Sequence, residues 1–302
     1  MKKKQEFKIL YRKTNVNIKC KNNKNIRILG ALKMDKFKKN ERVVALIKIL
    51  SDNPNEIITL NRFSELLNAA KSTISEDISA AKKIIECLSL GEIETIPGAL
   101  GGVKYKPVLT MEQSIDFLKK LCIKLQEPSR IIPGSFIYMS DILGDADKVS
   151  TIGRIFASCF KEKNADYIVT IETKGITPAI MTARAMNIPL VIARTDNRVT
   201  EGSTISVNYV SGSKKIQTMS VSKRSIKEGS KVIIIDDFMK AGSTIKGLND
   251  LVKEFKAEVI GTGVIMSTAE PDHKVINDYV SLLILNGVDE TTRAIDIVPG
   301  IK

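Results

Sequence analysis

The second half of the chain alternates short runs of valine, isoleucine and leucine with amphipathic stretches. Such runs include "YIVTI", "PLVIA", "KVIIID", "AEVIGTGVIM" and "YVSLLIL", whereas "TPAIMTARAMN" and "STIKGLNDLVKEF" have helical spacing. Strands that are apolar on both faces and separated by helices are typical of a parallel sheet covered on both sides. We therefore expect residues 109–302 to form an α/β domain with a mostly parallel sheet. The alternating segment "TISVNYVSGSKKIQTMSV" predicts a β-hairpin within it.

Residues 34–108 have a different pattern. The segments "ERVVALIKIL", "TLNRFSELL" and "NAAKSTISEDISAAKKIIECL" each place apolar residues at helical spacing. The following stretch, "GEIETIPGALGGVKYKPVL", predicts two strands around a Pro/Gly turn. Three helices followed by a hairpin indicate a winged helix-turn-helix domain. Thr73 and Glu76 fit a capping box, which would begin the third helix at about Ser72 or Thr73.

The polar face of the third predicted helix suits DNA. Small hydroxyls near a helix N-terminus can reach base edges in the major groove, and lysines can hold phosphates. The candidate DNA-binding residues are Lys71, Ser72, Thr73, Ser75, Ser79, Lys82 and Lys83 of this helix and Lys104 of the wing. The alternative is an ordinary solvated helix face, because residues 34–108 carry a net charge of only +1.

The net charge of +13 comes mostly from the N-terminal tail. Residues 1–33 hold eleven Lys and Arg against Glu6 alone, a net of +10, whereas residues 109–302 carry only +2. Two interpretations of the tail remain open. It is either a disordered arm that adds phosphate affinity, or a stretch ahead of a true start at Met34. Bulk charge therefore does not identify a DNA-binding protein here.

Several classes of protein do not fit the composition. No apolar run approaches the roughly 18 residues needed to span a membrane, and the lysine-rich start lacks the apolar core of a secretory signal. Four scattered cysteines and the single His273 argue against a zinc site. We expect reduced thiols in a cytoplasmic chain that has no metal site of its own and contacts no membrane.

The stretch "VIIIDDFMKAGSTIKG" carries the clearest chemistry. An apolar strand ends in Asp236 and Asp237, and ligands of open α/β sheets bind outside the carboxyl ends of strands. Small residues then allow a turn whose backbone N–H groups, Lys240 to Thr244, converge on a phosphate at a helix N-terminus. The carboxylates can accept hydrogen bonds from sugar hydroxyls or from the waters of Mg²⁺. The pattern predicts a phosphorylated ribose site; the alternative is a junction whose aspartates only cap the helix.

This stretch resembles the phosphoribosyl pyrophosphate motif of type I phosphoribosyltransferases, with Ala241 where those enzymes usually have Thr or Ser. The stretches "AAKSTISEDI", "PGALGGVKY", "TKGI", "VTEGSTISVNYVSGS" and "IIDDFMKAG" further resemble the purine operon repressor family, over roughly Phe37 to Leu285. The resemblance implies a homodimer that represses purine synthesis and transport genes and is not a catalyst. Phosphoribosyl pyrophosphate would be the inducer, with or without Mg²⁺, and guanosine tetraphosphate its competitor. The final segment, "NGVDETTRAIDIVPGIK", departs from the pattern, and we assign it no role.

The resemblance also implies roles by position. The acidic pair would take the ribose hydroxyls, the following turn the 5′-phosphate, and the "TKG" loop the diphosphate. Arg194 would be a second anion anchor, and Phe136 and Phe238 would face the base, with core packing as their alternative. The expected effector-binding residues are Phe136, Thr173, Lys174, Gly175, Arg194, Asp236, Asp237, Phe238, Met239, Lys240, Ala241, Gly242, Ser243 and Thr244.

Two other functions stay open beside an effector-controlled repressor. One is a catalytically active purine phosphoribosyltransferase with an accessory N-terminal domain. The other is a nucleotide-binding module whose N-terminal domain only dimerises. For the repressor we also hypothesise that Lys214 and Lys215, in the loop "SGSKK", let the bound diphosphate compete electrostatically with DNA.

Overall fold

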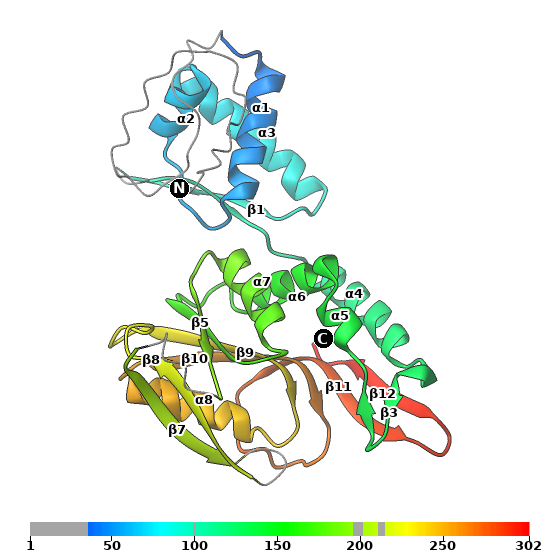
Figure 1. Ribbon diagram of the computed structural model, residues 1–302. Coiled ribbons are helices and arrows are strands. Elements are labelled where there is room, and N and C mark those ends of the chain that lie inside the picture. Colours follow the sequence, from blue (N-terminus) through cyan, green and yellow to red (C-terminus); the bar gives the residue numbers. More distant parts are fainter. Residues whose placement is uncertain (1–35, 99–100, 196–201, 211–214, 302) are drawn as a thin grey trace, which may run out of the picture.

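The N-terminal domain is a winged helix, as predicted. The computed structural model describes residues 36–98, 101–195, 202–210 and 215–301, and Figure 1 shows two domains in them. The elements of the first are α1 (Lys39–Asp52), α2 (Leu60–Leu67), α3 (Lys71–Cys87), β1 (Glu92–Ile96) and β2 (Gly102–Lys106). Strands β1 and β2 pair antiparallel as the wing. The predicted apolar stripes form its core, in which Leu46, Phe63 and Ile74 are completely buried.

The predicted capping box of α3 is wrong. Helix α3 begins at Lys71, and its N-cap is Ala70, which makes no side-chain cap. The turn between the helices sets this start. Asn68 ends α2 in the left-handed conformation, and the Ser64 hydroxyl donates to the Ala69 carbonyl. The chain is therefore already directed into α3 before Thr73 can act as a cap.

A buried ion pair joins α1 to α3. Arg42 Nε donates to Asp77 Oδ2 at 2.6 Å, and its Nη2 donates to Oδ1 at 3.3 Å. Arg42 Nη1 also donates to the Phe37 carbonyl at 2.8 Å. Arg42 is 7% exposed and Asp77 only 1%. Removing one partner of such a pair leaves an uncompensated buried charge.

The second domain contains a six-stranded sheet in the order β12-β11-β10-β9-β5-β6. Five strands are parallel, and β12 is antiparallel to β11 at one edge, which confirms the predicted mostly parallel sheet. Its helices are α4 (Met111–Leu125), α5 (Ser140–Leu143), α6 (Ala146–Cys159), α7 (Ile176–Met186) and α8 (Ser243–Glu254), with the short 3-10 helix η1 (Pro128–Arg130). Its strands are β3 (Ile131–Ile132), β4 (Phe136–Ile137), β5 (Tyr167–Ile171), β6 (Leu190–Ala193), β7 (Thr204–Val210), β8 (Ile216–Ser222), β9 (Lys231–Met239), β10 (Glu258–Thr268), β11 (Val280–Asp289) and β12 (Ala294–Pro299).

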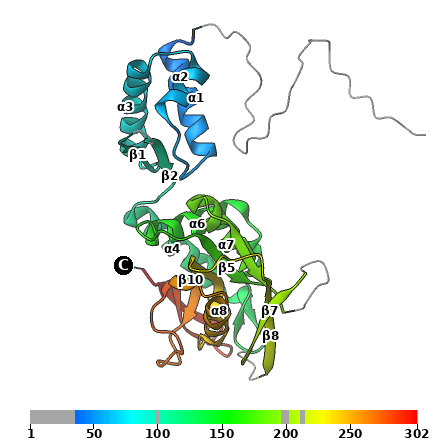
Figure 2. The same ribbon diagram turned by 90° about the vertical axis from the view of Figure 1, so that its left-hand side faces the viewer.

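Two apolar layers cover the sheet. Helices α4 to α7 pack on the face toward the winged helix, and α8 with the hairpin β7–β8 packs on the other (Figures 1 and 2). The chain passes from β2 into α4 between the two domains (Figure 2). Helices α6 and α7 thus lie between the sheet and the winged helix.

The unassigned C-terminal segment completes the sheet. In "AIDIVP" the side chains of Ile295 and Ile297 are buried, and β12 contacts α4. The turn before β12 holds a second hairpin, since Glu290 Oε1 accepts the N–H groups of Gly134 and Ser135 at 3.1 and 2.6 Å. This segment therefore supports the hairpin that carries Phe136.

Cysteines and membrane spans add no further feature. Within the described ranges Cys87, Cys122 and Cys159 are free thiols, and burial raises the pKa of Cys122 to about 11. Cys20 lies outside those ranges. No helix in the part of the chain that the structure describes is both long and apolar enough to cross a bilayer.

We expect Asp77→Ala to lower the free energy of unfolding by about 3–5 kcal/mol, because it leaves the Arg42 guanidinium buried without its carboxylate. The matched control is Asp52→Ala, which removes the exposed Lys48–Asp52 pair on α1 and is expected to cost about 0–1 kcal/mol. Urea unfolding followed by circular dichroism measures both. Equal losses in the two variants would contradict the importance of the buried pair.

Candidate functional site

Three predicted segments lie at one edge of the parallel sheet. Asp236 and Asp237 are near the carboxyl end of β9, Thr173 to Gly175 follow β5, and Arg194 follows β6. Strands β9, β5 and β6 are consecutive neighbours in the sheet, so their carboxyl ends meet. The structure therefore brings the acidic pair, the "TKG" loop and the arginine to one place.

The acidic pair is withdrawn from solvent. Asp236 is 4% exposed, and its Oδ1 accepts the Asp237 N–H at 3.0 Å. Burial raises the pKa of Asp236 well above its ordinary value of 3.8, and the charge of Asp237 raises it further. Burial also raises the pKa of Asp237, although the charge of Lys174 opposes the shift. Donors from a ligand would compensate for the water that these carboxylates have lost.

Gly175 is required by the closeness of the loop to Asp236. A Cβ on Gly175 would lie 2.5 Å from Asp236 Oδ1 and 2.5 Å from Thr170 Oγ1. Both distances are far below van der Waals contact, and neither partner can retreat, because Asp236 and Thr170 are buried in the sheet. The Glu172–Thr173 peptide just before is cis. Only glycine fits where the loop meets the acidic pair.

The turn after the acidic pair is a backbone-lined anion site. Gly242 adopts φ +87° as the N-cap of α8, and no side chain caps this helix. The N–H groups of a helix's first turn have no intrahelical partner, so they are suited to bind an anion. Two hydrogen bonds to its carbonyl groups stabilise the turn. Val275 N–H donates to Ala241 O at 2.9 Å, and Lys274 Nζ donates to Lys240 O at 3.0 Å.

The other predicted residues of this turn differ in exposure. Ala241, Ser243 and Thr244 are half-buried, and the Lys240 side chain is exposed. The Met239 side chain is 2% exposed and packs in the core beneath α8. Met239 therefore contributes to the turn through its backbone.

Arg194 acts on the "TKG" loop through Glu172. Its Nη1 lies 3.2 Å from Glu172 Oε2, and Glu172 Oε1 accepts the Thr195 N–H at 2.8 Å. Burial raises the pKa of Glu172, but the hydrogen bonds from Thr195 and the charge of Arg194 outweigh it and lower the pKa overall. Sequence reasoning missed Glu172, because nothing in the pattern before "TKG" distinguishes it from an ordinary strand end.

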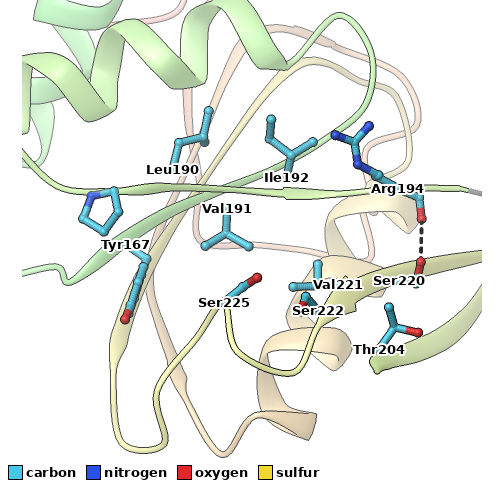
Figure 3. A pocket seen from close by; sticks show the side chains of 11 residues that line it. Tyr167, Leu190, Val191, Ile192, Arg194, Thr204, Ser220, Val221, Ser222 and Ser225 are labelled. Atoms are coloured by element: carbon cyan, nitrogen blue, oxygen red, sulfur yellow. Dashed lines mark hydrogen bonds between the residues drawn. The ribbon is translucent and has the colours of Figure 1, made fainter. Parts of the chain in front are cut away.

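A cavity of about 280 Å³ lies at the outer edge of the sheet, between β6 and β8 (Figure 3). Arg194 and Ser220 link these strands across it through backbone hydrogen bonds of 2.9 and 2.8 Å. Arg194 is the one predicted site residue in its wall, and the remainder is strand aliphatics and hydroxyls such as Leu190 and Ser225. It lacks the acidic pair and the glycine turn, so we place the candidate site at the carboxyl edge instead.

The hairpin β7–β8 stands beside the acidic pair. Gly247 of α8 allows it to approach, since a Cβ there would lie 2.8 Å from the Met219 side chain and 2.9 Å from that of Tyr209. Burial raises the pKa of Tyr209, and the charge of Asp236 adds to the shift. Tyr209 is therefore within electrostatic reach of the site, which sequence reasoning missed. Lys214 lies outside the described residues, and Lys215 is exposed.

Phe136 and Phe238 are surface residues. Phe136 is 66% exposed on the hairpin β3–β4, and Phe238 is 37% exposed at the end of β9. The core-packing alternative is therefore wrong for Phe136 and does not hold for Phe238. That either ring faces a base remains a prediction.

Seven of the eight predicted DNA-contacting residues lie on α3, and Lys104 lies on the wing strand β2. Lys71, Ser72, Ser75, Ser79 and Lys83 are exposed, and Thr73 and Lys82 are half-buried. Beside the start of α3 a groove of about 380 Å³ runs between α2 and the wing.

Two of the lysines have acidic neighbours. Lys104 lies 3.1 Å from Glu94 within the wing, and Lys82 lies 3.7 Å from Glu86 on α3. Their role in DNA binding remains a prediction.

Comparison with known proteins identifies the family. Residues 38–107 match the family described as "Bacterial purine repressor, N-terminal", and residues 142–293 match "Phosphoribosyl transferase domain". The chain is 46% identical over 266 residues to the purine biosynthesis transcriptional repressor PurR of Bacillus subtilis, covering 88% of this chain and 93% of the relative. The chain belongs to the PurR family.

The PurR family includes regulators of opposite sign. A purine biosynthesis transcriptional activator PurR of Lactococcus lactis is 41% identical over 265 residues, covering 87% of this chain and 98% of the relative. Enzymes also match part of the chain. A xanthine phosphoribosyltransferase of Pediococcus pentosaceus is 33% identical over 168 residues, covering 53% of this chain and 88% of the enzyme.

If the site holds phosphoribosyl pyrophosphate, as the sequence resemblance implies, we expect Gly175→Ala to weaken that binding at least tenfold, a loss of about 1.4 kcal/mol. The new methyl group would push the loop away from Asp236. Isothermal titration calorimetry measures the affinity, and Gly287→Ala is the control, because nothing lies within 4 Å of the Cβ it adds. Unchanged affinity in Gly175→Ala would contradict the assigned loop geometry.

We expect Asp236→Asn to stabilise the protein at neutral pH while it weakens effector binding. The folded state holds the Asp236 proton more tightly than the unfolded state, so the wild type loses stability as pH rises above about 3.8. Asparagine does not titrate, so the variant should gain stability relative to wild type at pH 7, and the gain should vanish below about pH 3.8. Thermal unfolding across pH measures it, with the exposed Asp278→Asn as control. A variant less stable than wild type at pH 7 would refute the expectation.

Proposed function

We propose that this PurR-family chain is a DNA-binding repressor of purine biosynthesis and transport genes that phosphoribosyl pyrophosphate releases from DNA. The observation that carries the proposal is an acidic pair, with Asp236 buried and Asp237 half-buried, beside an amide-lined turn and at the same edge as the "TKG" loop. A sugar with phosphates at both ends matches the donors and acceptors there. The printed name of the Bacillus subtilis relative supports the repressor assignment.

Each part of the effector has a matching group. Asp236 and Asp237 accept the ribose hydroxyls, or the waters of a Mg²⁺ ion that travels with the diphosphate. The N–H groups from Lys240 to Thr244 hold the 5′-phosphate at the start of α8. The "TKG" loop, with the Lys174 charge, holds the diphosphate. The pair's raised pKa values favour ligands that bring donors or cations.

Guanosine tetraphosphate would compete for the same site. It also combines a ribose with phosphate groups, which the acidic pair and the amide-lined turn can hold. The exposed rings of Phe136 and Phe238 offer faces for a base, which phosphoribosyl pyrophosphate lacks. The two ligands would therefore differ in their contacts and in the protein state that each favours.

On the DNA side, the N-terminal turns of α3 would enter the major groove, with lysines on phosphates. A homodimer would place two such helices on operator half-sites. Release requires that phosphoribosyl pyrophosphate bind the state of weak DNA affinity more tightly. Electrostatic competition at Lys215 and its neighbour Lys214 remains a hypothesis for part of this coupling.

A catalytic role is the second candidate, favoured by the likeness to xanthine phosphoribosyltransferase. Ala241 argues against it, because it removes a hydroxyl that the transferase motif usually supplies to the phosphate. Incubating the protein with phosphoribosyl pyrophosphate, Mg²⁺ and each nucleobase separates the two candidates. Nucleotide formed with turnover would favour the enzyme.

We expect the wild-type protein to shift DNA from upstream of purine genes, and phosphoribosyl pyrophosphate to abolish that shift. The double variant Asp236→Ala/Asp237→Ala should bind the same DNA and no longer respond, because the sugar has lost both acceptors. Gel shifts at fixed salt measure both, since phosphate contacts depend strongly on salt. If the wild type ignores the ligand, or the double variant is still released, the proposed effector site is wrong. A reporter gene tests the sign of regulation, since some relatives are named activators.

A further inference from the structure

Helix α7 connects the candidate effector loop to the winged helix. It begins directly after Gly175, and its first turn is bonded to the loop: Ile176 N–H donates to Thr173 O at 3.3 Å, and Ala179 N–H to Gly175 O at 3.1 Å. Near its other end, the Ala185 carbonyl accepts Asn55 Nδ2 at 2.6 Å, a contact between residues 130 positions apart. One rigid element thus contacts both functional regions.

The Asn55 end is fixed to the wing. Asn55 lies between α1 and α2, and its own N–H donates to the Tyr105 carbonyl of β2 at 2.7 Å. Three residues later, Ile58 and Val103 of β2 exchange two backbone hydrogen bonds of 2.9 Å each. A displacement of Asn55 is therefore transmitted to the wing strand.

The Gly175 end is fixed to the acidic pair. The space for a Cβ at Gly175 is filled by Asp236 and Thr170, so a displacement of the Asp236 carboxylate would press on the N-cap residue of this helix. A sugar bound to Asp236 and a diphosphate bound to the loop would both act on the same helix end.

Helix α6 packs directly against α7 and holds the linker between the domains. A Cβ on Gly153 of α6 would lie 2.5 Å from the Met181 backbone carbon, which shows that the two helices are in direct backbone contact. From α6, Arg154 Nε donates to Pro107 O at 2.9 Å, and Ser158 Oγ accepts the Leu109 N–H at 2.8 Å. The pair α6–α7 therefore contacts the winged-helix domain at its α1–α2 connection and at the segment after β2.

We propose that the α6–α7 pair transmits occupancy of the effector loop to the wing, and that the Asn55–Ala185 hydrogen bond is the contact that transmits it. This rests on the proposed function, in which phosphoribosyl pyrophosphate changes DNA affinity. The bond lies far along α7 from the acidic pair and belongs to neither the DNA-contacting face of α3 nor the ligand site. Losing it should uncouple two intact sites, each of which keeps its own affinity.

Asn55→Asp tests this, because aspartate tolerates the left-handed backbone at φ +56° and lacks the amide donor. The matched control is Asn53→Asp, which removes an equivalent bond, Asn53 Nδ2 to Ile49 O at 2.7 Å, inside the winged helix. Calorimetry measures the affinity for phosphoribosyl pyrophosphate, and gel shifts measure the affinity for upstream purine-gene DNA with and without it. If aspartate disturbs DNA binding or folding, Asn55→Gly replaces it as the test of the coupling. Glycine also allows this backbone conformation and adds no charge.

We expect the Asn55 variants to keep both separate affinities within about twofold, and to lose most of the ligand-induced drop in DNA affinity. Allosteric factors are roughly 5- to 150-fold, so the loss is measurable, and Asn53→Asp should respond like wild type. Linkage requires that DNA also stop weakening ligand binding in the variant. A full wild-type response in Asn55→Gly would overturn the route through α7. A wild-type protein whose DNA affinity ignores the ligand would instead overturn the proposed function.

Discussion

The close approach of the "TKG" loop to the buried Asp236 carboxylate is the constraint on which the second domain depends. The sheet order places β5 beside β9, and the absence of a side chain at Gly175 lets the two strand ends touch. The same glycine is the N-cap of α7, so the candidate site and the helix that leads toward the wing meet at one residue. The proposed effector site and the proposed route to the wing therefore meet at the contact between Gly175 and the Asp236 carboxylate.

Removing the acidic pair from solvent has a cost in folding stability. Burial opposes the ionisation of both carboxyl groups, and the charge of Asp237 further opposes that of Asp236, so we expect the pair to destabilise the unliganded fold at neutral pH. Structural carboxylates are usually paired, as Asp77 is with Arg42 in the winged helix. This contrast supports the proposal that Asp77 stabilises the fold whereas Asp236 and Asp237 bind a ligand.

Much of the architecture could be predicted from the sequence. Apolar periodicity located the three helices and the wing, and the unbroken apolar strands indicated a parallel sheet, because both patterns are local. The start of α3 was mispredicted, since the turn at Asn68 and Ser64 overrides the capping pattern at Thr73. Strand β12 was left unassigned although "AIDIVP" alternates, because an edge strand is defined by a neighbour distant in sequence.

The candidate site could be predicted only where its residues are contiguous in the sequence. The stretch "VIIIDDFMKAGSTIKG" indicated the acidic pair and its turn. Glu172, Tyr209 and Asn55 interact with residues that are distant in the sequence, so only the fold reveals these contacts. Periodicity also did not reveal that Met239 is a core residue.

The central claim is that one crevice at the carboxyl edge of β5 and β9 holds the activated sugar. A crystal structure with phosphoribosyl pyrophosphate and Mg²⁺ tests it most directly. The account predicts ribose hydroxyls within hydrogen-bond distance of Asp236 and Asp237, and the 5′-phosphate on the N–H groups that begin α8. Ligand found in the cavity between β6 and β8, or no ligand at the acidic pair, would contradict it.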